Sequence, residues 1–390
     1  MDQKPTLADY RWLISDQARP WLDRVVESHE SLVQQTTALR KDLSPAQAHL
    51  VLEQAELRRR ARAKFSQANM MFFTRRGLEQ ASGERMAEYK ARRFQKNLPV
   101  ADLCCGIGGD LLSLAQYNTV VGVDRCEISI VLAEGNSRLP GLQATSFLCQ
   151  SVTVDSLTEV GQWHIDPNRR PTGPRVTRVE YAEPPVEEID QLLQVNRHGA
   201  IKLAPAANVE TRWPAAELEW ISDGRECKQL VAWNGKLARF PGDHTATCVR
   251  KDGQTDTWTG KPRILLTEAP RIDDCIYEPD PAVLAADLVG DMAGSFGLKA
   301  LTPHGGYLTG PLQSSHPLLH TYRVVEQWPF DVKRLKAALR SRKIGQLTIK
   351  KRGVDISPSQ LATRLAPVGD EQGILFVLPY AGKTRAVLAQ

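Results

Sequence analysis

Apolar residues recur at helical spacing through the first quarter of the chain. Such residues gather on one face of a helix, and no stretch up to about residue 96 alternates as a strand would. The positions that set this spacing are Leu13, Ile14, Trp21, Leu22, Val25, Val26, Leu50, Leu52, Ala55 and Leu57. The pattern predicts a helical N-terminal domain over residues 1–96.

The pattern changes after Pro99, which interrupts the helical spacing. Short apolar runs then alternate with stretches of helical periodicity, and this alternation is typical of a parallel sheet with crossover helices. The expected strands are Val100–Leu103, Thr119–Val123, Ser146–Leu148, Trp163–Ile165 and Ala200–Leu203. The sequence therefore predicts a Rossmann-like α/β domain over residues 97–270.

Further β-rich segments lie between Glu219 and Leu266, separated by the turn pairs Asp223-Gly224, Asn234-Gly235 and Asp252-Gly253. Two-residue turns of this composition favour antiparallel hairpins, which we expect to complete the sheet. Residues 278–281, Glu-Pro-Asp-Pro, are typical of a linker that leads into a helix over Pro281–Leu298. A connector over residues 271–320 follows from these signals.

A small α+β domain is expected over residues 321–390. Its predicted order is strand, helix, strand, helix, strand: Arg323–Val325, Val332–Arg340, Leu347–Lys351, Pro358–Leu365 and Ile374–Leu378. With 390 residues, the chain is long enough for two or three domains.

Composition narrows the class of protein. Hydrophobic residues make up 42% and charged residues 24%, a balance typical of globular proteins, and the net charge of +5 is only mildly basic. The seven cysteines form no CxxC pair and no zinc-finger spacing, so we expect reduced thiols and no metal site. No signal peptide opens the sequence and no apolar run approaches the ~20 residues that span a bilayer, which predicts a cytoplasmic protein away from membranes.

The most informative segment runs from Val100 to Asp110. An apolar strand ends in Asp102, Cys104 and Cys105 lead into a turn through Gly106, Gly108 and Gly109, and a helix is expected to open at Leu111. Glycines allow a ligand to approach the backbone closely, and the helix start offers unpaired N–H groups. Asp102 and Asp110 flank the turn, where they would repel a pyrophosphate and suit a cationic sulfonium with an amino-acid tail.

A second carboxylate, Asp124, follows the strand Thr119–Val123. An acid at this point is placed to accept both hydroxyls of a ribose. Strand, acid, glycine turn, helix, strand and acid together indicate a nucleoside-sulfonium site. An ordinary βαβ unit with a glycine turn and a nicotinamide-dependent enzyme are the alternatives.

These segments resemble the first two motifs of class I S-adenosylmethionine-dependent methyltransferases. The stretch Phe73–Ser82, which continues through Glu84 and Ala87 to Phe94, is similar to the segment before the glycine turn of trimethylguanosine synthases. Nearly the whole chain, from Ala61 onward, resembles an uncharacterised bacterial methyltransferase group with a C-terminal THUMP-like domain. The resemblance implies S-adenosyl-L-methionine as cofactor, held by Asp102, Cys104, Gly106, Gly108, Asp110 and Asp124.

The same resemblance places Gln80 and Ser82 beside the methionine moiety. Ser82 before a helical run is equally a good N-cap. Methyltransferases often carry an acid after the third strand that reaches the adenine amino group. This chain offers Gln150 or Ser151 there, with Asp155 further on.

The end of the fourth strand is where α/β enzymes bind ligands. Methyltransferases of nucleobase amino groups usually have Asp/Asn-Pro-Pro-aromatic there, and this chain has Asp166-Pro167-Asn168-Arg169. We expect Asp166 and Pro167 to orient the nucleophile. The missing aromatic residue leaves base stacking unsupported. Arg169 and Arg170 are expected to contact phosphate, or alternatively to be solvated or paired with Glu183 and Glu187.

Two basic clusters favour a nucleic-acid partner. Residues 58–96 carry twelve basic and three acidic side chains, and the C-terminal module repeats the bias with the run Lys350-Lys351-Arg352, which we expect to bind RNA. Residues 344–353 resemble the strand and turn of the THUMP-like domain, a module associated with RNA. Either cluster alone is usually a solvated face.

The sequence thus predicts a methyltransferase that modifies a base nitrogen in structured RNA such as tRNA or rRNA. Two alternatives remain: a methyltransferase for a small metabolite or a protein side chain, and an RNA-binding protein whose cofactor pocket has decayed.

Overall fold

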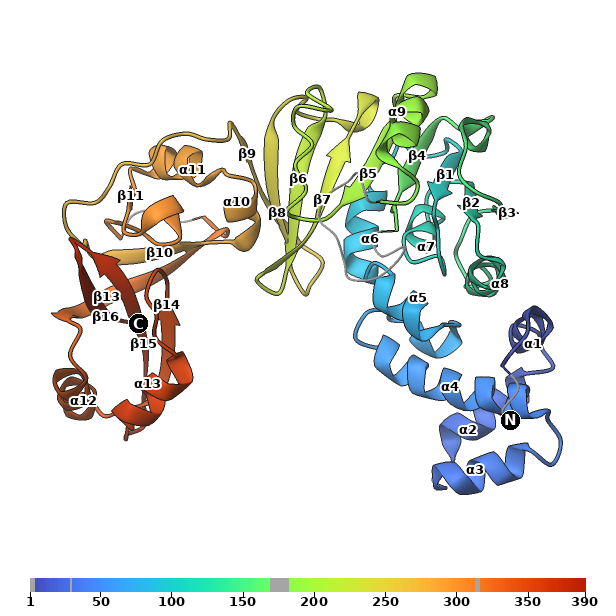
Figure 1. Ribbon diagram of the computed structural model, residues 1–390, viewed down its shortest axis with the longest axis horizontal. Helices are drawn as coiled ribbons and strands as arrows, with labels where there is room; N and C mark the ends of the chain where they lie inside the picture. Colours follow the sequence, from blue (N-terminus) through green and yellow to red (C-terminus); the bar gives the residue numbers. More distant parts are fainter. Residues whose placement is uncertain (1–3, 29, 169–181, 313–315) are drawn as a thin grey trace. The chain divides into compact units, whose positions relative to one another are not determined.

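The computed structural model describes residues 4–28, 30–168, 182–312 and 316–390 (Figure 1). The chain divides into two compact units. The first comprises residues 1–217, 229–241 and 251–253, and the second comprises residues 218–228, 242–250 and 254–390.

The first unit begins with the expected helices. They are α1 (Leu7–Leu13), α2 (Arg19–Glu27), α3 (Leu32–Leu39) and α4 (Pro45–Ala61). Thr6, Ser31 and Ser44 cap α1, α3 and α4, and each shares a reciprocal capping box with the third helical residue. Such boxes satisfy two otherwise unpaired N–H groups. The prediction of a helical N-terminal region is confirmed.

All five strands predicted for the parallel sheet are present. They are β1 (Val100–Leu103), β2 (Val120–Asp124), β3 (Thr145–Cys149), β4 (Gln162–Ile165) and β5 (Gly199–Leu203). They pair in parallel in the order β3-β2-β1-β4-β5, and β7 (Glu226–Trp233) adds an antiparallel strand to β5. Strand β3 is largely exposed, as expected for an edge. The predicted Rossmann-like class is confirmed.

Helices connect and cover these strands (Figure 1). They are α5 (Arg75–Gln80), α6 (Glu84–Ala91), α7 (Leu111–Leu114), α8 (Glu127–Asn136) and α9 (Val186–Val195). Helix α6 packs against α7, and α8 packs on β2 and β3. Helix α7 opens at Leu111, as predicted, directly after the glycine turn.

The register between β1, β4 and β5 decides which side chains meet. Asp102 lies opposite His164, and His164 lies opposite Ala200. Because side chains alternate along a strand, Asp166 and Lys202, two positions further on, project from the same face as His164 and Asp102. Four polar side chains therefore converge on one face of the sheet, near the carboxyl ends of its strands.

The second unit contains β6 (Glu217–Asp223), β8 (His244–Val249) and β9 (Thr255–Gly260). Turns follow β6 at Gly224, directly after Asp223 at the strand end, and separate β8 from β9 at Asp252-Gly253, as predicted. The expectation of a hairpin at Asn234-Gly235 is wrong, because Gly235–Leu237 forms a 3₁₀ turn. The expected linker is also wrong in part: Cys275–Pro279 forms strand β10, and a helix begins at Pro281 with Asp280 as its N-cap.

The connector continues with α10 (Pro281–Ala285), α11 (Val289–Phe296), β11 (Lys299–Ala300) and β12 (Leu308–Gly310). The predicted helix over Pro281–Leu298 is thus broken between Ala285 and Val289. Strands β10, β11 and β12 pair with the C-terminal module in a single sheet of order β11-β12-β10-β13-β16-β15-β14.

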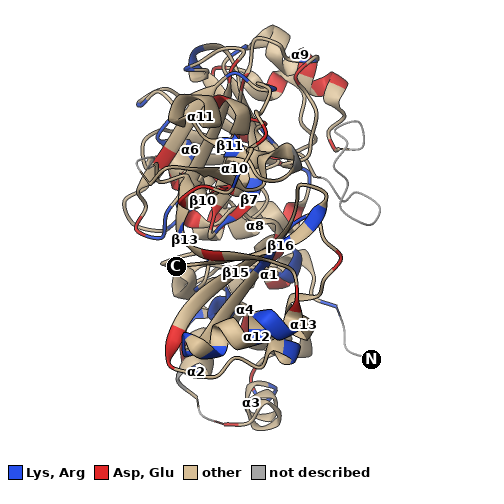
Figure 2. Cartoon of the chain, turned by 90° about the vertical axis from the view of Figure 1, so that its left-hand side faces the viewer, with Lys and Arg blue, Asp and Glu red and all other residues tan. Residues whose placement is uncertain are grey.

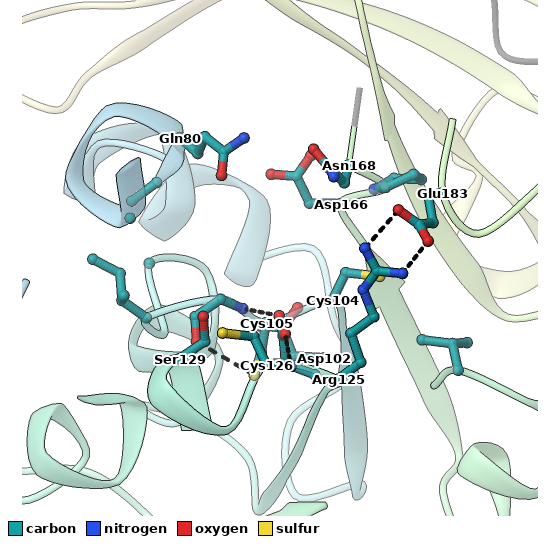
Figure 3. Close-up of a pocket in the computed structure, with 18 of the residues that line it drawn as sticks. Gln80, Asp102, Cys104, Cys105, Arg125, Cys126, Ser129, Asp166, Asn168 and Glu183 are labelled. Carbon is teal, nitrogen blue, oxygen red and sulfur yellow. Dashed lines mark hydrogen bonds and ion pairs between the residues drawn. The ribbon is translucent and has the colours of Figure 1, made fainter. Parts of the chain in front are cut away.

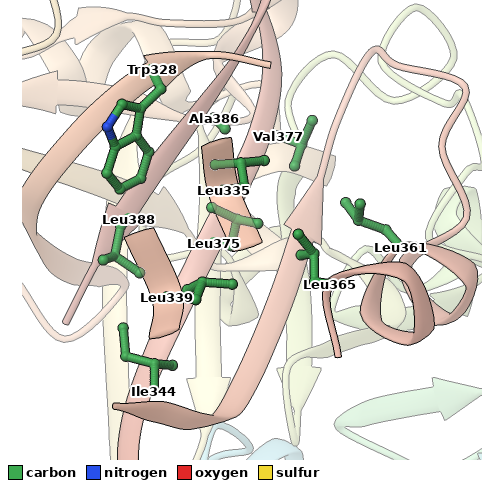
Figure 4. Packing of buried hydrophobic residues seen from close by; sticks show 10 residues of the cluster. All are labelled: Trp328, Leu335, Leu339, Ile344, Leu361, Leu365, Leu375, Val377, Ala386 and Leu388. Atoms are coloured by element: carbon green, nitrogen blue, oxygen red, sulfur yellow. The ribbon is translucent and has the colours of Figure 1, made fainter. Parts of the chain in front are cut away.

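The C-terminal module consists of β13 (Leu319–Pro329), α12 (Val332–Ser341), β14 (Ile344–Lys351), α13 (Pro358–Leu365), β15 (Glu371–Tyr380) and β16 (Lys383–Ala389). The apolar faces of α12 and α13 pack on the sheet through Leu335, Leu339, Leu361 and Leu365, which meet Trp328 and Leu375 (Figure 4). The predicted α+β order is confirmed, and the structure adds one further strand, β16, at its end.

Candidate active site

A cavity of about 650 Å³ opens beside the carboxyl ends of β1, β2 and β4. This volume is ordinary for a small-molecule site. Its walls come from the glycine turn, the α5 segment, the residues after β2 and β3, and the segment Asp166–Asn168 (Figure 3). Asp102, Cys104, Gly106, Asp110 and Asp124, all expected at the cofactor, line it together.

The backbone of the turn explains its glycines. Gly106 and Gly108 have φ values of 55° and 90°, a region that L side chains rarely adopt. A Cβ on Gly106 would meet open space, whereas one on Gly108 would contact Ala133. Gly106 therefore faces the cavity, and Gly108 allows the turn to pack on α8 without lining the cavity.

Asp124 fixes the turn and faces the cavity. Its Oδ2 accepts the N–H of Gly106 at 2.9 Å, and its Oδ1 accepts the N–H of Cys126 at 2.8 Å. An ionised carboxylate has about four acceptor positions. Two bonds to the backbone leave capacity for two hydroxyl groups, so the side chain fits a ribose.

Asp102 is buried and only half satisfied. Its Oδ1 lies 2.7 Å from Nδ1 of His164, while its Oδ2 has no hydrogen-bond partner among the described residues. Burial raises the pKa of Asp102, against the opposing effect of His164. A buried acceptor without a partner is costly. An ammonium group in the cavity would satisfy Oδ2.

Asp110 is already neutralised from within the protein. Nζ of Lys90 lies 2.6 Å from its Oδ1, and Oγ of Ser82 donates to its Oδ2 at 2.7 Å. Burial alone would raise the pKa of Asp110, but Lys90, His164 and Lys202 together lower it below its usual value. Asp110 therefore lines the cavity, as its predicted place beside the cofactor requires, but its carboxylate is already paired with Lys90 and hydrogen-bonded to Ser82.

Ser82 does not cap a helix. The N-cap of α6 is Gly83, so that interpretation of Ser82 is wrong. The Ser82 hydroxyl instead donates a hydrogen bond to Asp110 and accepts one from Nζ of Lys202 at 2.9 Å. Gly109 lies against Ala81 and Ser82, which brings this segment over the turn.

Asp166 and Pro167 follow β4 and line the cavity, as predicted. Lys202 forms an ion pair with Oδ2 of Asp166. The Asp166 side chain is 24% exposed, while that of Lys202 is only 7% exposed. Asp166 is thus the accessible member of the pair. Figure 3 shows it facing Gln80 of α5 across the cavity.

The predicted adenine positions Gln150 and Ser151 also line the cavity. The side-chain amide of Gln150 lies 3.5 Å from Oγ of Ser156. Arg125 forms a bidentate ion pair with Glu183 at the rim (Figure 3).

Three buried residues of this region were not predicted: Lys90, His164 and Lys202. Two of them have a signal in the sequence. His164 alternates with Asp166 along one strand, and Lys202 interrupts the otherwise apolar strand β5. Lys90 lies within a basic run that is typical of an exposed face, but its side chain is only 2% exposed.

Arg169 and Arg170 lie outside the described residues. Of the partners considered for them, Glu183 pairs with Arg125, and Glu187 lies 3.3 Å from Arg212.

Lys350, Lys351 and Arg352 lie in the second unit. Nζ of Lys350 donates to Glu278 at 2.6 Å, Lys351 is exposed, and the Arg352 guanidinium lies 5.3 Å from the centre of the Tyr307 ring. Lys351 is the exposed member of the three, whereas Lys350 and Arg352 are half-buried.

Much of the basic cluster at residues 58–96 has structural roles. Arg58 is buried and donates to the carbonyl of Met71, and Lys64 donates to the carbonyls of Leu78, Glu79 and Ala81. Arg93 forms a buried ion pair with Glu217. This cluster therefore presents less positive charge to a partner than its sequence suggests.

Within the described ranges, no group of three or more His, Cys, Asp or Glu side chains could hold a metal ion. Nor does any helix of those ranges have the length and apolar character needed to cross a membrane.

Comparison with known proteins gives concordant results. Residues 319–390 match the THUMP domain-like family. An uncharacterised S-adenosylmethionine-dependent methyltransferase, recorded in two Mycobacterium tuberculosis strains, is 28% identical over 333 residues, which cover 81% of this chain and 88% of the relative. A proposed methyltransferase of Porphyromonas gingivalis W83 has the same fold, with a TM-score of 0.76 and 22% identity over 98% of this chain and 97% of that one.

The sequence relative carries the enzymatic class, and the structural neighbour shows the fold over nearly the full length. Together with the family match at the C-terminus, they confirm the expected resemblance. The chain is an S-adenosylmethionine-dependent methyltransferase with a THUMP-like C-terminal domain.

Proposed function

We propose that this protein methylates a base nitrogen in a structured RNA such as tRNA or rRNA. The observation that carries the proposal is the combination of the sulfonium-compatible cavity with a THUMP domain-like module at residues 319–390. The cavity supports the chemistry, and the module supports the substrate class.

S-adenosyl-L-methionine, when bound, supplies the methyl group. The chain's own residues provide its cradle: Asp124 accepts from the ribose hydroxyls, Asp102 offers the unpartnered Oδ2 to the ammonium group, and Gly106 leaves room for close approach. Gln150 and Ser151 border the adenine end, while Ser82 and Cys104 complete the wall.

At the other end, Asp166 and Pro167 receive the target nitrogen. Methyl transfer mainly requires that a nitrogen lone pair be held in line with the methyl group. The Asp166 carboxylate can accept hydrogen bonds from an amino group and so orient that lone pair.

RNA binding is assigned to the C-terminal module. Helix α12 buries Leu335 and Leu339. Its basic residues Lys333, Arg334, Lys336 and Arg340 are exposed. Figure 2 marks basic segments of α12 in blue. Lys343 and Lys351 of the same module are also exposed. Such a surface attracts phosphates.

The direct test is incubation of the protein with radiolabelled S-adenosylmethionine and total RNA, followed by mass spectrometry of nucleosides. We expect label in one methylated nucleoside with wild-type protein and none with Asp166→Ala. Label in a purified metabolite or protein without any RNA product would support the alternative substrate class and overturn the RNA assignment.

Charge removal on α12 should weaken RNA binding in a salt-dependent way. The double variant Lys336→Ala/Arg340→Ala is expected to reduce the slope of log affinity against log salt by about 2, because each lost phosphate contact removes about one unit. Fluorescence anisotropy with labelled tRNA at several salt concentrations measures the slope. The control Arg271→Ala/Lys299→Ala removes two exposed charges of the second unit that lie outside the THUMP-like residues. Equal slopes for both variants would contradict the assignment.

Gly106→Ala should weaken cofactor binding more than it destabilises the fold. A left-handed conformation costs an alanine about 1–2 kcal/mol, and the added methyl group would project toward the cofactor. Gly224 is a matched control, because its φ of 60° is similar and a Cβ there also meets open space, away from the cavity. Calorimetry should show weaker S-adenosylmethionine binding for Gly106→Ala only. Similar cofactor affinities for the two variants would count against this position of the cofactor.

A further inference from the structure

Seven polar side chains form one continuous chain of contacts at the cavity wall. Asp102 contacts His164 at 2.7 Å, His164 contacts Lys90 at 3.5 Å, and Lys90 contacts Asp110 at 2.6 Å. Asp110 then accepts from Ser82 at 2.7 Å, Lys202 donates to Ser82 at 2.9 Å, and Lys202 pairs with Asp166. We call these seven residues the buried network.

Its two ends lie at the two ends of the proposed reaction site. Asp102 lies in β1 and lines the part of the cavity that we assign to the amino-acid portion of the cofactor. Asp166 lines the part that we assign to the target nitrogen. Strand alternation places Asp102, His164, Lys202 and Asp166 on one face, and α6 covers that face with Lys90.

The two lysines act from behind the cavity wall. Asp102, Ser82, Asp110 and Asp166 line the cavity, whereas Lys90 and Lys202 do not. Both lysine side chains are at most 7% exposed. A buried ammonium group is unfavourable unless it is paired, and an apolar residue could fill the same volume at less expense. We therefore expect the role of Lys90 and Lys202 to be their interaction with the carboxylates that line the cavity, Asp110 and Asp166.

The charges are nearly balanced. Three carboxyl groups and two ammonium groups make up the network together with His164 and Ser82. Lys202 pairs with Asp166 and donates to Ser82, and its ammonium group lies farther, at 4.0 Å, from Asp110, which Lys90 and Ser82 contact more closely.

We propose that Lys202 is a positioning residue whose ion pair fixes the Asp166 carboxylate at the cavity wall, so that Asp166 can take up the proton lost by the methylated nitrogen. This inference rests on the proposed function. The nitrogen lone pair forms the new N–C bond while the S–C bond breaks and its electron pair stays on sulfur. The nitrogen, now positively charged, releases a proton to the Asp166 carboxylate. The partly exposed side chain then passes this proton to water.

The pH dependence of turnover follows. A carboxylate must be ionised to accept a proton, so kcat falls as Asp166 becomes protonated at low pH. A neighbouring positive charge favours the ionised form, and losing it makes protonation easier. In Lys202→Gln, which can still hydrogen-bond but carries no charge, the acid limb of the kcat profile should move to higher pH.

Three further variants test whether the charge of Lys202 and the carboxylate of Asp166 cause the expected shift. Lys202→Arg keeps the positive charge, so the acid limb of its kcat profile should match that of the wild type. Asp166→Asn should lose most of the activity, and its remaining kcat profile should show no acid limb. Lys96→Met removes an exposed lysine of the same unit that lies over the Tyr117 ring and should change nothing. Two further measurements do not depend on turnover. The affinity for S-adenosylmethionine should be nearly unchanged in Lys202→Gln. In urea unfolding, Lys202→Gln should lower the free energy of unfolding less in an Asp166→Asn background than in the wild type.

The outcomes separate the two claims. A wild-type protein that methylates no RNA overturns the proposed function, and the inference falls with it. A wild-type protein that methylates RNA while Lys202→Gln keeps an unshifted acid limb overturns the inference alone. If Lys202→Gln does not fold, an acid limb that persists in Asp166→Asn overturns it equally.

Discussion

An Asp124→Ala variant is expected to bind S-adenosylmethionine about 100-fold more weakly than the wild type. The carboxylate is assigned two hydrogen bonds to ribose hydroxyls, and a bond to a charged acceptor contributes about 1.5–3 kcal/mol. The variant also loses the bonds to the N–H groups of Gly106 and Cys126, so the turn is less well fixed. Isothermal titration calorimetry measures the affinity.

The matched control for this change is Asp155→Ala. Asp155 lies in the short 3₁₀ turn after β3, is exposed and does not line the cavity. Its removal should leave the affinity within about twofold, consistent with a surface substitution. Circular dichroism should show both variants folded. An Asp124→Ala protein with undiminished affinity would show that the ribose is bound elsewhere.

A Lys90→Met variant is expected to lose about 3–5 kcal/mol of unfolding free energy, since it leaves the buried Asp110 carboxylate without its closest cation. Burial lowers the pKa of Lys90 itself, while Asp110 acts in the opposite direction. The variant's destabilisation should be measured by urea unfolding at neutral pH.

Two comparisons test the cause. Arg92→Met removes an exposed arginine paired with Glu88 and should cost less than about 1 kcal/mol. The double variant Lys90→Met/Asp110→Leu removes both buried charges and should recover much of the lost stability, because apolar replacement of a whole buried pair is often neutral. A double variant as unstable as Lys90→Met would mean that lost packing, rather than an unpaired charge, is the cause.

The cofactor half of the site could be predicted because its signals are local in sequence. The glycine turn, Asp102 and Asp124 lie within twenty-five residues, and their spacing alone implies a strand, a turn, a helix and a second strand. The exact match of α13 with its predicted bounds has the same origin, since Ser357 before Pro358 is a clear helix start.

The rest of the site depends on contacts between distant segments. Lys90 and Asp110 meet only because α6 covers the sheet, and Lys202 meets Asp166 only because β5 pairs with β4. Ser82 shows how a local rule can fail: its position suits a cap, but Gly83 takes that place and the serine bonds to Asp110.

The basic run at residues 58–96 shows a related limit of sequence interpretation. A count of charges cannot show that Arg58, Lys64 and Arg93 reach into the protein and bond to its carbonyls and to Glu217. Long side chains can bury their stems and still hold a polar partner. The exposure of the C-terminal basic cluster could be predicted from the sequence, because the apolar stripe of α12 packs inward and leaves its lysines and arginines on the opposite face.

The most direct test of the central claim is a crystal structure of the protein soaked with S-adenosylmethionine. We predict density in the cavity with the ribose hydroxyls within hydrogen-bonding distance of Asp124 and the ammonium group at Oδ2 of Asp102. A cavity that stays empty at saturating cofactor, or that takes up a nicotinamide dinucleotide instead, would contradict this account.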